Sequence, residues 1–122
     1  MKTSYAVKNV EKLLRELDDS RNSLAYLTSI REDAPLSPRK SALLKKRIRY
    51  LTHTITAVEH ALGRLEPIEQ TILEGLFLRP ASADALEEVC EACGLERSSV
   101  YRYRTRALKK LAAALYGEGE VI

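Results

Sequence analysis

The sequence is poor in the residues and patterns that other structural classes require. It has no tryptophan, one phenylalanine and two cysteines in 122 residues. Two cysteines without a secretory context predict free thiols in a reducing compartment. No segment alternates apolar and polar residues with period two, and no internal repeat or low-complexity tract is present. With 45% hydrophobic and 30% charged residues, the composition favours packed amphipathic helices, and we expect an all-α fold.

Long hydrophobic runs are also absent. No apolar stretch approaches the roughly 18 residues that span a bilayer, and the N-terminal sequence MKTSYAVKNVEK has charges where a signal peptide has an apolar run. We therefore expect a cytoplasmic protein that does not contact a membrane. A chain of this length forms one compact unit or two small ones, which disfavours a large enzyme architecture.

The motifs of common enzymes and metal sites are missing. The sequence has no glycine-rich phosphate loop, no nucleophile elbow and no clustered histidine and carboxylate set, so we expect no catalytic residue, cofactor or metal. Cys90 and Cys93 form a CxxC pair, but there is no second pair, and both His53 and His60 fall on another predicted helix. Core packing of the two cysteines is favoured over zinc binding or thiol exchange. The two histidines are expected at the surface.

Charge is unevenly distributed along the chain, although the net charge is only +3. Residues 1–65 hold 13 Lys and Arg against 7 Asp and Glu, residues 66–94 hold 1 against 7, and residues 95–122 hold 6 against 3. Basic segments thus flank an acidic middle. Such segregation favours a helix that meets an anionic partner, and solvated charged faces are the competing interpretation.

Apolar periodicity in the N-terminal half predicts two long amphipathic helices. In the first, steps of three and four residues start at Val10 and are interrupted at Ser20. Segment 31–38 holds two prolines, which predict a turn and a new helix start. We expect residues 1–64 to form an antiparallel hairpin for dimerisation or polymerase contact; a homodimer built on the same seams is the alternative. The seam of the second helix is Leu44, Ile48, Leu51, Ile55, Val58, Leu62 and Leu65.

The C-terminal half predicts three shorter helices. Pro67 opens the first of them, and Ser82 is expected to cap the second. Gly94 should end that second helix in the left-handed conformation. The last helix is expected from about Arg97 to Tyr116, closed by glycines, with a tail at residues 117–122.

Residues 86–103, LEEVCEACGLERSSVYRY, have the spacing of a helix-turn-helix. A small residue at Cys90 lets two helices approach, Gly94 turns the chain, Leu95 fills the core, and Val100 packs the second helix against the first. Each of these roles is steric. Together they set the crossing angle that allows the second helix to project into a major groove of DNA.

Residues 65–111 resemble region 4 of bacterial sigma factors. The opening LEPIEQTIL is similar to the family's Leu-x-Pro-x-Glu start, LEEVCEACGLERSSV is similar to its helix-turn-helix, and RALKKL resembles its basic ending. The resemblance implies that residues 65–116 are a DNA-binding domain of a transcription regulator. Nothing in residues 1–64 resembles the polymerase-holding domain of complete sigma factors. In size and layout the chain looks more like the small phage and prophage regulators of the ArpU and RinA type.

The resemblance also implies which residues meet DNA. In the family, the positions that match Arg97, Ser98, Tyr101 and Arg102 face the major groove. Ser98 stands where the family usually has Glu, and Arg102 where it commonly has Gln, so a different DNA sequence should be recognised. The two arginines suit guanine edges, and the later basic residues would touch phosphates or a protein neighbour. The full candidate set is Arg97, Ser98, Ser99, Tyr101, Arg102, Arg104, Thr105, Arg106, Lys109 and Lys110.

The basic residues also fit interpretations that involve no DNA. A basic helix C-terminus is favourable for the helix dipole by itself. For a second basic cluster we favour a solvated face over contact with flanking DNA or an acidic face of polymerase; its members are Arg39, Lys40, Lys45, Lys46, Arg47 and Arg49. Two alternative functions are a module that binds RNA polymerase or an activator with minor DNA contact, and a phage protein that recognises DNA during packaging.

Overall fold

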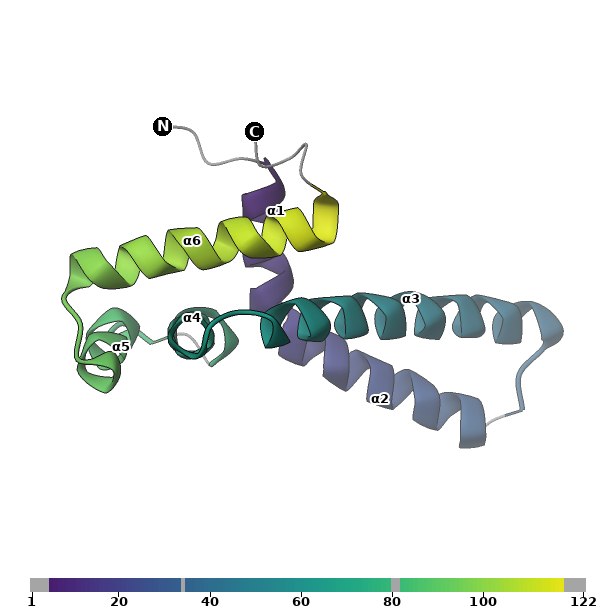
Figure 1. Ribbon diagram of the computed structural model, residues 1–122. Helices are drawn as coiled ribbons and strands as arrows, with labels where there is room; N and C mark the ends of the chain where they lie inside the picture. The colour runs from purple at the N-terminus through teal and green to yellow at the C-terminus, as the bar shows by residue number, and fades with distance from the viewer. Residues whose placement is uncertain (1–4, 34, 80–81, 118–122) are drawn as a thin grey trace.

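The computed structural model describes residues 5–33, 35–79 and 82–117, and all regular structure in these ranges is helical. The expected all-α fold class is therefore confirmed. Figure 1 shows the helices in chain order. They are α1 (Tyr5–Arg15), α2 (Leu17–Asp33), α3 (Pro38–Gly63), α4 (Pro67–Leu73), the π-helical turn η1 (Glu74–Leu78), α5 (Ala85–Cys93) and α6 (Arg97–Tyr116).

The single long helix predicted from Val10 onward is wrong, because this stretch forms two helices, α1 and α2. The chain bends at Glu16, between α1 and α2, while Glu16 N still donates to Lys12 O (3.0 Å) and Ser20 N to Glu16 O (2.8 Å). The bend has a tertiary cause, because α1 packs against α6 and η1 whereas α2 packs against α3. One straight helix could not follow both partners.

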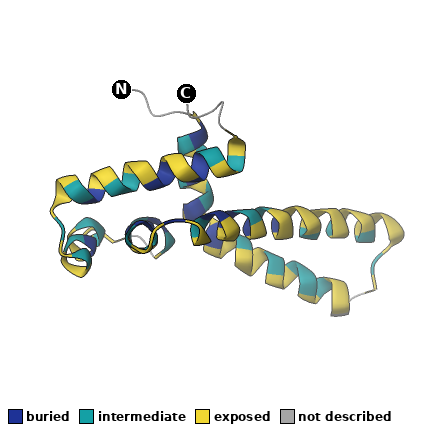
Figure 2. Cartoon of the chain, in the orientation of Figure 1, coloured by how far each residue is buried: buried dark blue, intermediate teal, exposed yellow. Residues whose placement is uncertain are grey.

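Helices α2 and α3 run antiparallel and form an arm that projects from the rest of the molecule (Figure 1). As predicted, Ser37 caps α3: Lys40 N donates to Ser37 Oγ at 3.3 Å, and Pro38 occupies the first turn. Burial is confined to the base of the arm, where Leu17 and the second half of α3 are covered. In the outer half no described residue is buried (Figure 2). The predicted seam is thus only partly covered there.

The main core joins both ends of the chain. Val10 and Leu14 of α1 lie in one cluster with Ile55 of α3 and with Leu108 and Leu111 of α6. This core contains residues from both sides of the boundary predicted between residues 64 and 65. Because α1 turns away from α2 at the bend, its apolar side faces α6. A second, smaller core beneath α5 contains Ile72, Val89 and Val100.

The helix that Pro67 opens continues from α4 into the π-helical turn η1, which ends at Leu78, and Arg79 N donates to Glu74 O at 3.1 Å. The segment that follows η1 differs from expectation. Ser82 does not cap α5, because its Oγ accepts from Asp84 N (3.2 Å) in a preceding turn and the helix begins only at Ala85. The hydroxyl is satisfied by a local turn that competes with the helix cap.

The remaining predicted helix ends are confirmed. Gly94 has φ of 65° and ends α5 in the left-handed conformation, and α6 has the predicted bounds. Gly117, with φ of 89°, closes α6. Gly119 and the rest of the predicted tail lie outside the described residues.

Candidate nucleic-acid interface

The turn between α5 and α6 is held by backbone hydrogen bonds. Leu95 N donates to Cys90 O at 3.1 Å, and Gly94 N donates to Glu91 O at 3.3 Å. Without a Cβ, glycine adopts this left-handed conformation at no steric cost. Leu95 and the fully buried Val100 then pack at the second core. The four residues to which the sequence assigned steric roles therefore lie around one turn.

Both cysteines pack as expected. Cys90 and Cys93 are partly buried free thiols against the second core. Burial, and to a smaller extent the neighbouring Cys90, raises the pKa of the Cys93 thiol, which disfavours the reactive thiolate. His53 and His60 are exposed, also as expected. Within the described ranges, no three His, Cys, Asp or Glu side chains gather in a way that could hold a metal ion.

One face of α6 is open to solvent and lined by predicted DNA-binding residues. Tyr101 is 51% exposed, and Arg102 lies beside it with its guanidinium 5.8 Å from the centre of the Tyr103 ring. Steps of three and four residues place the lining side chains on the same side of the helix. They form a shallow groove, whose lining residues are Ser98, Tyr101, Arg102, Thr105, Arg106 and Lys109. Six of the ten predicted residues therefore share one surface.

Three further predicted residues lie at the edges of this groove or away from it. Arg97, before it in the chain, forms an exposed ion pair with Glu87 of α5, and Ser99 is partly buried. Arg104 points toward α1, where Glu11 pairs with it, and its guanidinium lies 5.2 Å from the centre of the Phe77 ring. This position disfavours the phosphate contact expected of Arg104, because packing of α1 on α6 supplies another partner.

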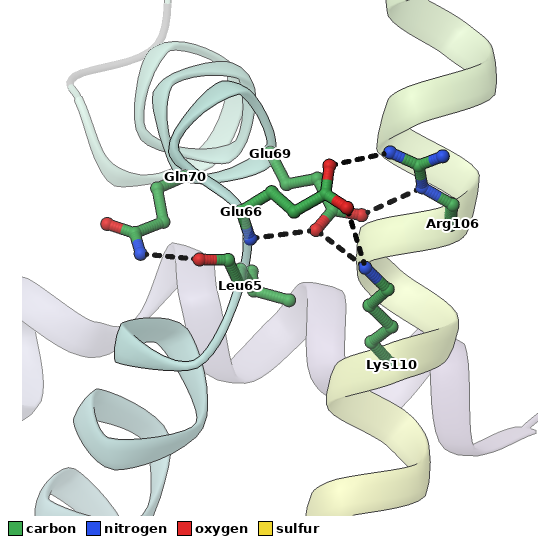
Figure 3. Close-up of polar contacts among 6 residues, drawn as sticks. All are labelled: Leu65, Glu66, Glu69, Gln70, Arg106 and Lys110. Carbon is green, nitrogen blue, oxygen red and sulfur yellow. Dashed lines mark hydrogen bonds and ion pairs between the residues drawn. The ribbon is translucent and has the colours of Figure 1, made fainter.

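The C-terminal end of the groove is tied to the start of α4 by a cluster of four charged residues, shown in Figure 3. The Glu69 carboxylate is completely buried. It accepts from Lys110 Nζ at 2.9 Å, from Arg106 Nε at 3.1 Å and from the Glu66 backbone N–H at 3.0 Å. Arg106 also donates to Glu66 at 3.1 Å. Two helices that are distant in sequence are thereby joined.

The hydrogen bonds of this cluster keep Glu69 ionised. Burial by itself raises the pKa of the Glu69 carboxyl, but hydrogen bonds from Lys110, from the Glu66 backbone and from Arg106 outweigh it, and the net pKa is lowered. A buried carboxylate is tolerable only with such partners. Glu69 belongs to the LEPIE block and the two cations to the RALKKL block. The acidic middle next to a basic end hinted at this pairing, but sequence reasoning did not assign it.

Two cations of α6, Arg102 and Lys109, are not held in ion pairs of this kind by the residues that the structure describes. Arg102 and Lys109 are exposed and have no carboxylate partner in the described part of the chain. Arg106 lines the groove, but its guanidinium is also paired with the carboxylates of Glu66 and Glu69. The charge available to an anionic ligand on α6 is therefore concentrated at Arg102 and Lys109.

Comparison of the chain with family models, with curated proteins and with solved structures finds no match in any of the three. The resemblance to sigma-factor region 4 stays a prediction from the quoted blocks of sequence. None of the described helices combines the length and the apolarity that crossing a membrane requires. The class defined by the structure is an all-α protein whose last helix presents a polar and basic face beside a tight inter-helix turn.

Proposed function

We propose that the chain is a sequence-specific regulator of transcription that places α6 in the major groove of double-stranded DNA. The observation that carries the proposal is the open face of α6, where Ser98, Tyr101, Arg102, Thr105 and Lys109 line one groove. Residues 97–116 contain six Lys and Arg and no Asp or Glu. A helix with such a face suits both the width of the major groove and the charge of the backbone.

The side chains on this face suit different parts of DNA. The guanidinium of Arg102 can donate two parallel hydrogen bonds to the acceptors of a guanine edge, and Ser98 and Tyr101 can donate or accept. Lys109 lies seven residues after Arg102, about 10 Å further along the helix axis, where a phosphate contact is the better match. Recognition of bases is thus assigned to the first half of α6 and anchoring to the second.

The ion pairs around α6 support this assignment by fixing the helix on the body of the protein. Arg104 and Arg106 bind Glu11 and the α4 carboxylates, so the pose of α6 relative to α1 and α4 is set before DNA is met. Such preorganisation lowers the entropic cost of binding. Arg97 and Glu87 are 65% and 52% exposed, and an exposed pair of this kind contributes little. Arg97 can therefore exchange Glu87 for a base edge.

The second candidate function is a module that binds RNA polymerase or an activator. One observation favours it: Arg97, Arg104, Arg106 and Lys110 already have carboxylate partners. The attraction of α6 for DNA is therefore weaker than six cations would suggest. A protein that recognises phage DNA during packaging would use the same face as the regulator, and only its genomic context would differ.

The test is a selection of bound sequences from random duplex DNA, followed by binding of single variants to selected and scrambled duplexes. Arg102→Ala should weaken binding to the selected duplex by about 1–3 kcal/mol and relax the preference at one base pair. Lys109→Ala should weaken binding to both duplexes equally and lower the salt slope by about one. Lys12→Ala, an exposed cation on α1, is the matched control and should change neither.

The outcome that would contradict the proposal is also specific. If no sequence motif emerges at low salt and both α6 variants bind DNA like the wild type, α6 does not recognise DNA. Loss of polymerase capture in the same variants would then favour the protein-binding module.

A further inference from the structure

The outer half of α3 concentrates positive charge that no ion pair among the described residues neutralises. Residues 38–58 contain no Asp or Glu, and the facing stretch of α2, residues 20–31, contains none either. Six cations on this part of α3 are exposed and have no carboxylate partner among the residues that the structure describes. They are Arg39, Lys40, Lys45, Lys46, Arg47 and Arg49.

This lack of partners contrasts with the basic residues that lie near carboxylates. Arg21, at the base of the arm, pairs with Glu59 at 2.8 Å, and the cluster at Glu69 pairs Arg106 and Lys110. At these two places a carboxylate from another part of the chain neutralises the cations. Along the outer arm, residues 20–31 of α2 provide no carboxylate, and Glu32 and Asp33 occur only at the outer end of that helix.

The spacing of the cations is unfavourable in isolation. Lys45 and Arg49 are four residues apart and Lys46 and Arg49 three, so like charges are neighbours on the helix surface. The side that holds Lys46 and Arg49 lies away from the seam residues Leu44 and Ile48, which are partly covered by α2. An anion outside the chain would remove the repulsion. The arrangement is therefore better suited to a bound polyanion than to solvent alone.

The cationic stretch is extended, and its length limits the kind of anion that fits. From residue 39 to residue 49 the helix rises about 15 Å, so six charges are spread over a length along which a duplex presents about nine phosphates. A single acidic side chain would meet one or two of these cations. Lys45, Lys46 and Arg49 share one side of the helix, and a regular array of phosphates would meet all three.

The basic stretch lies apart from the groove on α6. In Figure 1 the outer arm and the start of α6 lie at opposite ends of the molecule. We propose that the outer half of α3 is a second DNA-binding surface, in place of the solvated face that the sequence by itself favoured, and that it contacts the phosphates of duplex DNA without selecting a sequence. The inference rests on the proposed function for its ligand, but it concerns a different surface and a different kind of contact. It gives the arm a role in affinity and leaves base recognition to α6.

The experiment uses the whole chain and a triple variant, Lys45→Gln with Lys46→Gln and Arg49→Gln. Binding to selected and scrambled duplexes long enough to reach both surfaces, about 40 base pairs, is measured over a series of salt concentrations. Each lost phosphate contact lowers the slope of log K against log salt by about 0.9. The triple variant should therefore lose nearly three units of slope and on the order of a hundredfold in affinity at 0.1 M salt, equally on both duplexes.

The matched control removes the same charge elsewhere. Lys8, Lys12 and Arg64 are exposed and outside the outer arm, and their combined change to Gln should lower the slope by less than one. Circular dichroism and thermal melting verify that both triple variants fold like the wild type. If the two triple variants behave alike, net charge explains the effect and the surface on α3 is refuted. If the α3 variant binds DNA normally but no longer captures polymerase, the partner is an acidic protein and the proposal is wrong.

Failure of the two proposals can be told apart. If the selection yields no motif and Arg102→Ala has no effect, but the α3 variant loses its salt slope, α6 does not recognise bases and the second surface stands. If Arg102→Ala acts as expected and the α3 variant keeps the wild-type slope, only the second surface falls. A wild-type chain that binds no duplex at low salt overturns both.

Discussion

Replacing Glu69 with Ala tests the polar connection between α4 and α6. The change removes a carboxylate that accepts three hydrogen bonds, two of them from cations. A hydrogen bond to a charged group contributes about 1.5–3 kcal/mol, and a buried ion pair costs about 3–5 kcal/mol to break. The partners Arg106 and Lys110 are 47% and 42% exposed, so water can solvate them after the change. The expected cost therefore lies below the upper end of the range for a fully buried ion pair.

We expect Glu69→Ala to lower the free energy of unfolding by about 2–4 kcal/mol. For a chain of this size that loss corresponds to a fall in Tm of roughly 10 °C, measurable by circular dichroism or calorimetry. Glu91→Ala, which removes an exposed carboxylate on α5, is the control and should change stability by less than about 0.5 kcal/mol. A double-mutant cycle with Lys110→Ala should give a coupling of about 1 kcal/mol or more. If Glu69→Ala and Glu91→Ala melt alike, the carboxylate is solvated and the connection adds nothing.

Three further predictions concern stability. The pKa of Glu69 is lowered in the folded protein, so its contribution to the free energy of unfolding is full above the ordinary value of 4.5 and declines as pH falls through the lower folded pKa. The melting temperatures of the wild type and of Glu69→Gln should therefore converge in that acid range. A difference that stays constant with pH would refute the assignment. Leu14→Ala should cost about 2–5 kcal/mol, since the side chain is 1% exposed in the main core; unchanged chemical denaturation would mean that α1 is not docked on α6. Gly75→Ala should cost about 1–3 kcal/mol of stability, because a Cβ there would overlap the Val89 side chain, and Val89→Ala should restore part of that loss. A Cβ at Gly63 meets nothing within 4 Å, so the control Gly63→Ala should be neutral or stabilising. Equal melting temperatures of the two glycine variants would contradict the close approach of Gly75 to Val89.

Local chemistry was enough to predict several helix ends. Ser37 with Pro38, Pro67 and Gly94 act through a side-chain cap, a fixed φ or a left-handed residue, and these effects depend only on near neighbours in sequence. The open face of α6 was predictable for the same reason, since a period of 3.6 residues places Tyr101 and Arg102 beside Ser98. Ser82 failed as a cap because two local hydrogen-bonding patterns competed, and its sequence does not say which is stronger.

Tertiary packing decided which apolar face meets which partner. The apolar steps from Val10 onward predict a buried side, but hydrophobic burial is non-directional and does not specify the helix that covers it. The bend at Glu16 exists because α1 is covered by α6 and α2 by α3. The same packing brings Glu11 to Arg104 and Glu69 to Arg106, across 93 and 37 residues of sequence. Periodicity could show that these cations lie on α6, whereas only the three-dimensional neighbours determine which remain free for a ligand.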